Sequence, residues 1–185
     1  MVCKEIVFTP CKYNCPIHTD VPAFIALIAQ KKYRESFEVI RKENPLPIVC
    51  GYICHHPCED RCRHIESDDL PMAIKGLKRF VGDQELKRGV KPIPIPKVRK
   101  KTKAVAIIGS GPAGLAAGLD LIKWGYKVTI FEKADRPGGM IAAAIPDFRL
   151  PKDILNKEIE LLKKTGIEIK TNICAGKDIT FDELF

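Results

Sequence analysis

The chain has 185 residues, 45% of them hydrophobic, and its 13 glycines and 14 prolines follow no fixed period. This composition excludes a wholly disordered chain, a collagen and a coiled coil, and the length suffices for one full domain or two small ones. The formal net charge of +8 is compatible with a nucleic-acid partner, and the positions of the basic residues in the sequence decide for or against one.

The residues from Met1 to Glu5 contain no basic region followed by an apolar stretch, so we predict no secretory signal and a cytoplasmic protein. The most apolar window, 104–122, is interrupted by Pro112, Asp120 and several glycines. A buried strand, turn and helix explain this window better than a bilayer span, so we expect no membrane segment.

Seven of the eight cysteines lie within the first 62 residues. A reducing compartment disfavours structural disulfides, so thiols gathered in this way predict a soft metal centre. The candidate metal ligands are Cys3, Cys11, Cys15, Cys50, Cys54, Cys58 and Cys62. The eighth cysteine, Cys174, stands alone and is expected to be a small buried hydrophobe.

The spacing of these cysteines favours iron and sulfide over zinc. Cys11 and Cys15, with Pro16 next, match the closing Cys-x3-Cys-Pro of a bacterial ferredoxin run. Within 50–62 a cysteine recurs every four residues, and Pro57 breaks what would otherwise be a single helix. We therefore expect two helical turns, separated by a break, that wrap thiolates around a cluster.

Zinc remains the alternative metal, because His55, His56 and His64 lie among the cysteines and zinc accepts both ligand types. Its usual sites contain Cys-x2-Cys pairs, and the sequence has none. We expect the three histidines to lie at the surface or beside the ligands.

Three helices are predicted in this cysteine-rich part. The first is capped by Thr19 or Asp20, with Pro22 in its first turn. The second carries an apolar stripe and stops at 44–47, where two prolines forbid continuation. The third runs over 72–80. The residues expected to face inward are Phe24, Leu27, Ile28, Tyr33, Phe37, Ile40, Ile74, Leu77 and Phe80.

The segment 87–103 carries eight Lys or Arg, no acid and three alternating prolines, so it holds the whole charge excess and favours an extended strap. We interpret it as a solvated linker, with a docking site for an acidic partner as the alternative. It contains no aromatic residue for base stacking, so we expect no nucleic-acid partner.

Beyond the strap, the pattern becomes that of an α/β domain. Ala104–Ile108 reads as a parallel strand buried on both faces, 112–124 as a helix and Lys127–Phe131 as a second strand. A further helix around Leu155–Leu162 and a short strand at Ile167–Lys170 complete a β-α-β-α-β half of a doubly wound sheet.

A Gly-x-Gly-x-x-Gly sequence, Gly109 to Gly114, lies between the first strand and helix of this unit, and Glu132 follows 23 residues after its first glycine. This context predicts a dinucleotide site, with the pyrophosphate at the helix N-terminus and the ribose hydroxyls on the carboxylate. The carboxylate also disfavours a 2′-phosphate. A glycine turn that serves packing alone is the alternative.

FAD and NAD share this fingerprint. Arg136-Pro-Gly-Gly139 resembles the Arg-x-Gly-Gly continuation of flavoproteins, which favours FAD over NAD. The predicted cofactor-binding residues are Gly109, Ser110, Gly111, Pro112, Ala113, Gly114, Glu132, Lys133, Arg136, Gly138, Gly139 and Met140.

The segments 19–28, 44–62 and 71–80, with Ile145-Pro-Asp-Phe-Arg-Leu-Pro151, resemble the glutamate synthase small subunit family, and the N-terminal part of dihydropyrimidine dehydrogenase is similar. The resemblance covers nearly the whole chain. It implies an α+β protein with three parts: a helical iron–sulfur domain (alpha-helical ferredoxin-like, 1–86), a linker (87–103) and a partial Rossmann-type FAD-binding domain (104–185).

The resemblance also implies ligands for two 4Fe-4S clusters. One set contains Cys11 and Cys62 plus two upstream cysteines, and the other contains Cys15, Cys54 and Cys58 plus a residue at Lys78. The chain departs from this pattern at both sets. Cys3 alone stands upstream, and a protonated Lys78 cannot ligate iron, so Cys50 is a possible substitute. We expect two clusters, with one intact cluster as the alternative.

The resemblance implies an oxidoreductase in which NAD(P)H reduces FAD and the clusters pass single electrons to a partner subunit. It therefore also implies a hetero-oligomer. The nicotinamide site is expected on a further C-terminal part or on the partner, so this chain alone should not turn over NAD(P)H. A cluster-bearing electron-transfer or assembly subunit without flavin chemistry, and a zinc-stabilised interaction module, are the alternatives. No catalytic acid, base or nucleophile is predicted.

Overall fold

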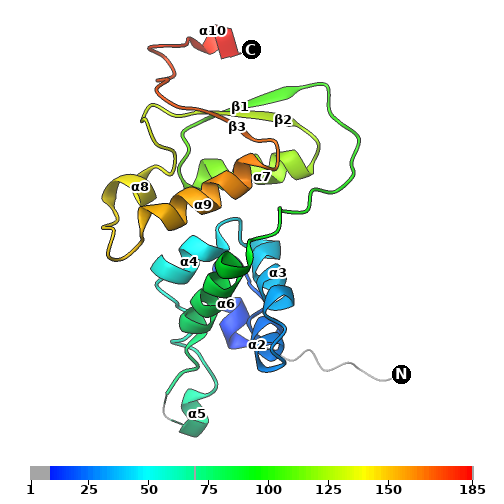
Figure 1. Ribbon diagram of the computed structural model, residues 1–185, viewed down its shortest axis with the longest axis vertical. Coiled ribbons are helices and arrows are strands. Elements are labelled where there is room, and N and C mark those ends of the chain that lie inside the picture. Colours follow the sequence, from blue (N-terminus) through cyan, green and yellow to red (C-terminus); the bar gives the residue numbers. More distant parts are fainter. Residues whose placement is uncertain (1–8, 69, 185) are drawn as a thin grey trace. The chain divides into compact units, whose positions relative to one another are not determined.

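The structure, a computed structural model, describes residues 9–68 and 70–184. It divides the chain into two compact units, Met1–Val90 and Lys91–Phe185. The first consists of helices and loops, and the second is built on a parallel sheet with helices (Figure 1). The predicted fold class, a helical region followed by a partial Rossmann-type unit, is confirmed. In the described part of the chain, no helix is both long and apolar enough to cross a membrane.

The helices of the first unit are α1 (Pro10–Tyr13), α2 (Val21–Ala29), α3 (Tyr33–Glu43), α4 (Pro47–Ile53), α5 (Ile65–Asp68) and α6 (Ile74–Arg88). Helix α2 begins where the cap was expected, because the Asp20 carboxylate accepts a hydrogen bond from the Ala23 N–H at 3.2 Å. Helix α3 packs on α2, and the buried Ser36 hydroxyl donates to the Phe24 carbonyl at 2.8 Å.

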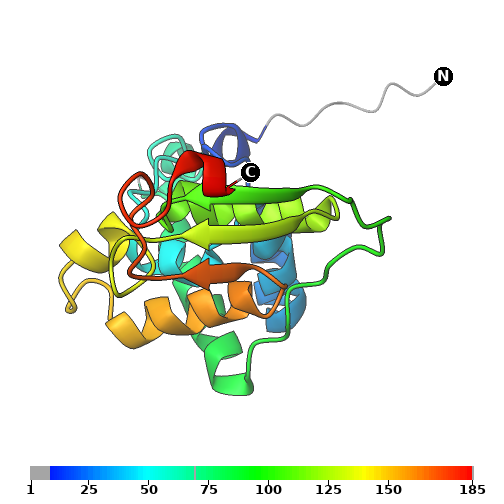
Figure 2. The same cartoon turned by 90° about the horizontal axis from the view of Figure 1, so that it is seen from above.

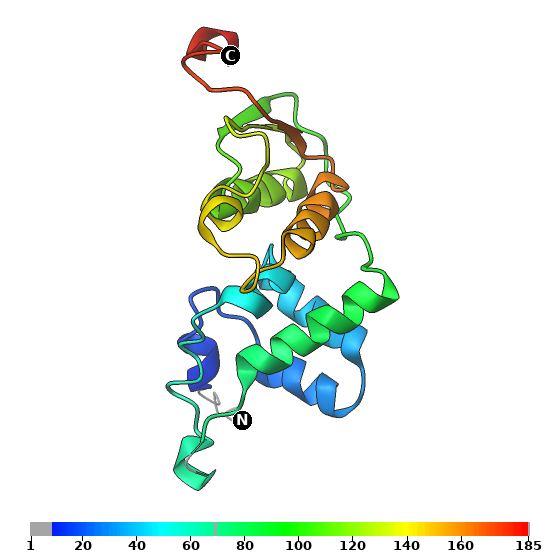
Figure 3. The same ribbon diagram turned by 60° about the vertical axis from the view of Figure 1, so that its left-hand side comes forward.

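Helix α6 lies against α3 and α4 (Figure 3). Its approach to α4 is close, since a Cβ at Gly51 would lie 3.0 Å from the Arg79 Cα. The helix expected over 72–80 thus begins two residues later and extends to Arg88. The inward placement of Phe80 is wrong: its side chain is 39% exposed and meets Tyr33 edge to face, because the buried face of α6 runs through Ile74 and Val81.

The two prolines after α3 end that helix as expected, and the second one also starts α4, which contains the first of the helical turns expected within 50–62 and begins before Cys50. Pro47 occupies the first turn of α4, where a backbone N–H would have no hydrogen-bond partner within the helix, so its absence in proline costs nothing. Cys50 lies within α4, and Cys54 is its C-cap. The break expected near Pro57 is present, so the four cysteines of 50–62 are not on one continuous helix.

The second unit contains β1 (Ala104–Ile108), α7 (Pro112–Lys123), β2 (Lys127–Phe131), α8 (Met140–Ala144), α9 (Lys152–Lys163), β3 (Glu168–Lys170) and α10 (Phe181–Leu184). The strands are parallel in the order β1-β2-β3, with Val105 opposite Val128 and Ile130 opposite Ile169. Helices α7 and α9 cover one face of this sheet (Figure 2).

The core of the second unit lies between the sheet and these two helices, and Leu115, Ile130 and Ile159 are almost fully buried there. The expectation that β1 is buried on both faces is wrong. Alternate β1 residues are exposed, and Ile108 is 56% exposed. The reason is that β1 is an edge strand of the described sheet and that α7 and α9 lie on the same side of it.

The basic segment is extended beyond α6, and near its end it contacts the turn before β2. The Lys101 N–H donates to the Gly125 carbonyl at 2.9 Å, and a Cβ at Gly125 would lie 2.7 Å from the Arg99 carbonyl oxygen. Gly125 has a φ of +90°, which a glycine adopts without strain. The end of the strap therefore follows the turn before β2.

Candidate cofactor sites

The first glycine turn joins β1 to α7. Gly109 has a φ of +93°, and its N–H donates to the Phe131 carbonyl at 2.8 Å, which ties the turn to β2. Gly111 is the N-cap of α7, and a Cβ on either glycine would point into open space. Gly114 lies behind them, where a Cβ would approach the Gly109 carbonyl oxygen to 2.1 Å. Only glycines allow the backbone to present this turn to a ligand.

The second glycine turn, Gly138 and Gly139, reaches the first one directly. Both residues have positive φ, and a Cβ at Gly139 would lie 2.9 Å from the Gly111 Cα. The Gly138 N–H donates to the carbonyl oxygen and to the hydroxyl of Ser110, each at 3.1 Å. Two segments almost thirty residues apart in sequence thus form one surface.

Glu132, the residue after β2, is tied to the first turn through Ser110. Its Oε2 accepts hydrogen bonds from the Ser110 N–H at 2.9 Å and the Ser110 hydroxyl at 2.6 Å, and its Oε1 accepts one from the Ala134 N–H at 2.9 Å. Burial opposes ionisation of this carboxyl, but these bonds and the adjacent Lys133 outweigh it and hold the pKa of Glu132 below its ordinary value. Glu132 is therefore an anion inside the protein.

A cleft of about 600 Å³ opens beside these turns, at the carboxyl edge of the sheet. It is lined by Gly109, Gly111, Glu132, Lys133, Arg136, Gly139 and Met140 among the predicted cofactor residues. The other predicted residues, Ser110, Pro112, Ala113, Gly114 and Gly138, are not in its lining. Doubly wound sheets bind their ligands at this edge, and the cleft is large enough for part of a dinucleotide.

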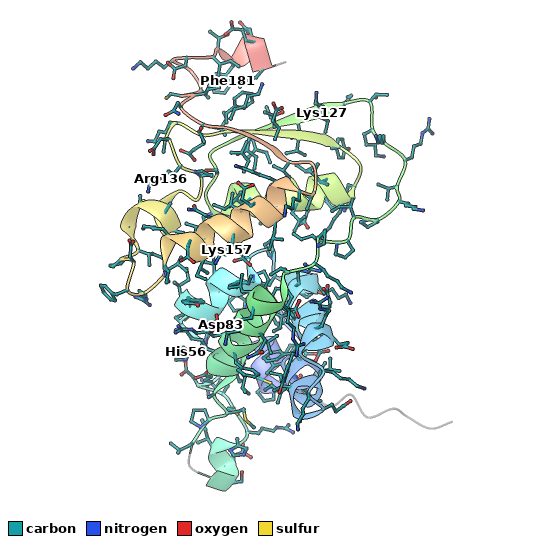
Figure 4. All side chains as sticks on the ribbon, in the orientation of Figure 1. His56, Asp83, Lys127, Arg136, Lys157 and Phe181 are labelled. Atoms are coloured by element: carbon teal, nitrogen blue, oxygen red, sulfur yellow. The ribbon has the colours of Figure 1, made fainter. Side chains whose placement is uncertain are left out.

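Arg136, one of the predicted cofactor residues, lines the cleft; its side chain is 73% exposed (Figure 4) and pairs with Asp135 at 3.7 Å. Cys174, expected to be buried, is only partly buried and lines the cleft instead. The three strands are parallel, so the loop after β3 leaves the sheet at the same edge as the loops after β1 and β2, and this brings Cys174 to the cleft.

The sequence analysis missed further cleft residues: Ile108, Phe131, Ala134, Asp135, Ala142, Ala143, Ile173 and Ala175. A signal for some of them was present, because residues that follow each parallel strand meet at one edge. Ala142 and Ala143 belong to α8, which is too short to have a clear periodicity.

The described cysteines of the first unit form two groups. Burial raises the pKa of the Cys58 thiol to about 11; Cys15 and Cys54 act on it in the same direction, whereas Lys78 opposes them. Burial likewise raises the pKa of the Cys11 thiol, and Cys62 adds to this effect. The electrostatic interactions therefore connect Cys58 with Cys15, Cys54 and Lys78, and Cys11 with Cys62.

Backbone amides support two of these sulfur atoms. The His56 N–H donates to Cys54 Sγ at 3.3 Å, and the Met72 N–H donates to Cys62 Sγ at 3.5 Å. Such bonds favour a thiolate and are among the levers that tune iron–sulfur centres. This donor set, soft sulfurs that accept amide bonds, fits an iron–sulfur cluster.

Within residues 9–68 and 70–184, no three His, Cys, Asp or Glu side chains lie close enough to share one metal ion. A multi-iron cluster is several atoms across and holds its thiolates further apart than one ion does. Cys3 falls outside the described residues, and none of the seven described cysteines forms a disulfide. Cys50 lies in α4, and its carbonyl accepts a hydrogen bond from the Cys54 N–H at 3.1 Å.

Comparison with protein families agrees with this division. Residues 1–90 match the family described as dihydropyrimidine dehydrogenase domain II, 4Fe-4S cluster, and residues 107–157 match the NAD(P)-binding Rossmann-like domain. Through these two domains the chain is similar to the family that includes the glutamate synthase small subunits. The resemblance inferred from sequence is thus confirmed, and a 4Fe-4S domain and a nucleotide-binding domain are its two parts.

Three relatives illustrate the family. The chain is 44% identical to the NADP(+)-dependent formate dehydrogenase subunit beta of Moorella thermoacetica, over 98% of this chain and 28% of the relative. It is 40% identical to the glutamate synthase [NADPH] small chain of Bacillus subtilis, over 92% and 34%. It is also 40% identical to the NAD-dependent dihydropyrimidine dehydrogenase subunit PreT of Escherichia coli (strain K12), over 95% and 42%. The chain therefore spans well under half the length of these relatives.

Proposed function

We propose that this chain is the iron–sulfur and FAD-binding part of an NAD(P)H-linked oxidoreductase that delivers electrons to a partner subunit. The observation that carries the proposal is that residues 1–90, which contain these thiols, match a 4Fe-4S cluster domain, and that Cys54 Sγ and Cys62 Sγ accept hydrogen bonds from backbone amides. The cleft of the second unit supplies the place for a nucleotide cofactor.

Two 4Fe-4S clusters fit these groups best. Cys15, Cys54 and Cys58 would hold one cluster, with the Lys78 ammonium beside it as a counter-charge. Cys11 and Cys62 would hold the other together with Cys3, leaving Cys50 as a further thiol for either group. The amide bonds to Cys54 and Cys62 would place one supported sulfur in each cluster.

In the second unit, the backbone amides around Gly109 and Gly111 would face a pyrophosphate, and Glu132 would accept a ribose hydroxyl with the capacity left on Oε1. The apolar wall formed by Met140, Ala142 and Ala143 would exclude water from the bound ring system. FAD, when bound, would supply the conversion of a two-electron hydride into single-electron steps that iron–sulfur clusters can carry.

The donor and the acceptor are assigned by analogy with the relatives. Their names include NADP(+), NADPH and NAD, and several are named as subunits. We propose that NAD(P)H binds outside this chain's own cleft and that a partner subunit takes the electrons. The chain itself is proposed to contribute cofactor binding and no catalytic acid, base or nucleophile.

Iron, acid-labile sulfide and flavin per chain should be measured after anaerobic purification. Two clusters and FAD predict about eight iron atoms and about one flavin per chain, whereas one cluster predicts about four iron atoms. Iron without flavin would indicate an electron-transfer subunit, and colourless protein that holds zinc would contradict the whole proposal. Glu132→Ala should lose flavin and keep the cluster absorbance, and joint loss would contradict separate cofactor units.

A further inference from the structure

The wall of the cleft contains a helix that cannot be stable by its own backbone bonds. Helix α8 has only five residues, and isolated helices much shorter than about 12 residues are marginal in water. Met140, Ala142 and Ala143 of this helix line the cleft. Something outside α8 must therefore hold this part of the wall in place.

At its start, α8 is held by packing. A Cβ at Gly138 would lie 3.1 Å from the Ala142 Cβ and 3.2 Å from Leu155 Cδ2, so the turn before α8 lies directly against α9. The Ala142 and Ala143 N–H groups both donate to the Gly139 carbonyl. These contacts fix where α8 begins and leave its last carbonyls to find partners elsewhere.

At its end, α8 is held by one ammonium group. Lys152 Nζ donates to the Ala142 carbonyl at 2.7 Å and to the Ile145 carbonyl at 3.1 Å, and it pairs with Asp147 Oδ1 at 3.2 Å. An ammonium has three donors, and all three are used on α8 and on the short loop that follows it. The loop is the Ile145–Pro151 segment, and the buried Leu150 anchors its far end.

The position of Lys152 in its own helix makes this arrangement unusual. Lys152 is the first residue of α9, where the helix dipole disfavours a cation. The same ammonium sits at the carboxyl end of α8, where the dipole and the terminal carbonyls favour a cation. Its hydrogen bonds to α8 and to the loop offset the unfavourable position in α9.

We infer that Lys152 is a positioning residue for the cofactor cleft: its ammonium holds the end of α8, and with it Met140 and Ala143, against α9. The inference rests on the proposed flavin site, since it assigns Lys152 a part in holding that site's wall. Lys152 does not itself line the cleft. Its effect on a bound cofactor is exerted through α8.

Lys152→Met keeps the length of the side chain and removes the donors. Lys157→Met is the matched control, because Lys157 lies on the same helix (Figure 4) and, among the described residues, its ammonium pairs with the Asp153 carboxylate alone, at 3.1 Å, where both side chains are more than half exposed. Amide hydrogen exchange and FAD titration should be measured for both variants of the full chain. Asp147→Asn tests the ion pair separately and should have a smaller effect, because Asp147 is 71% exposed.

We expect Lys152→Met to speed exchange within residues 140–149 about tenfold and to weaken FAD binding about tenfold, equivalent to about 1.4 kcal/mol, while Lys157→Met changes neither. Unchanged exchange in 140–149, or faster exchange throughout the second unit, would overturn the positioning role. Faster local exchange with unchanged FAD affinity would overturn its link to the cofactor. If the unmodified chain takes up no FAD, the flavin proposal fails, and the exchange comparison still judges the role of Lys152.

Discussion

The helical unit and the α/β unit place their functional groups on different kinds of support. Most cysteines of the first unit lie at helix ends or in the loops between α4 and α6, where α5 has only four residues and Leu70 is 70% exposed. In the second unit, the cleft is framed by turns that hydrogen bonds and a packed sheet hold in place. The first unit should therefore need bound metal for its full stability. In the second unit, by contrast, the cofactor should bind a site that is largely formed before it binds.

The largest expected effect comes from removing a thiol of the buried group. Cys58→Ser should remove about half of the bound iron and lower the thermal stability of the helical unit, because Cys58 is 8% exposed and lies among Cys15 and Cys54. Flavin content should not change. Cys174→Ser, in the other unit, is the control for thiol loss and should retain all the iron. Equal iron in both variants would remove Cys58 from the ligand set.

A second test concerns the part of the helical unit that does not depend on metal. Glu85 is buried, its Oε1 lies 3.2 Å from Arg34 Nε, and its Oε2 has no hydrogen-bond partner in the structure. Arg34→Met would leave a buried, unpaired carboxylate, so the free energy of unfolding should fall by about 3 kcal/mol.

Denaturant unfolding followed by circular dichroism measures this change. Lys42→Met is the control, since Lys42 is 81% exposed and its pair with Glu43 is long, at 3.9 Å. Adding Glu85→Met to the Arg34 variant should recover most of the loss. Equal stability of the Arg34 and Lys42 variants would show that the buried pair does not hold α3 to α6.

The smallest effect is expected in the α/β unit. Ser110→Ala removes the hydroxyl that donates to Glu132 and accepts from Gly138, and it should lower the free energy of unfolding of this unit by about 1–2 kcal/mol. Thr129→Val is the control: it removes an exposed hydroxyl-to-carboxylate bond, to Glu168, in the same sheet and should change stability by less than about 0.5 kcal/mol.

The pH dependence of the Ser110 variant provides a second reading. The folded pKa of Glu132 lies below its ordinary value, so its ionisation stabilises the fold above that ordinary value, and this contribution is lost as the pH falls through the folded pKa. In Ser110→Ala the Glu132 carboxylate lacks the hydrogen bond from the Ser110 hydroxyl, so burial raises its folded pKa relative to that of the unmodified protein. The stability that its ionisation contributes should therefore begin to be lost at a higher pH. The other charged groups of the cleft, Lys133, Asp135 and Arg136, are the same in both proteins. If both proteins lose stability over the same acidic pH range, the Ser110 hydroxyl does not stabilise the Glu132 carboxylate.

Local patterns predicted much of the fold. The Asp20 cap, the helix end at 44–47 and the strand–turn–helix around Gly109 all depend on neighbours in sequence, which short-range sterics and hydrogen bonding decide. The exposure of β1 and of Phe80 did not follow from sequence, because burial depends on which elements pack on each face. Helices α4 and α8 are too short for a periodic signal.

For the candidate sites, sequence by itself determined the chemistry: clustered thiols with ferredoxin-like spacing, and glycines with an acid at dinucleotide spacing. Tertiary structure alone decided how these groups combine. It brought Gly139 against Gly111, linked Ser110 to both Glu132 and Gly138, and placed Lys152 at the end of α8. The physical reason is that residue types and spacing set which bonds are available, whereas only the packing of distant segments determines which of those bonds form.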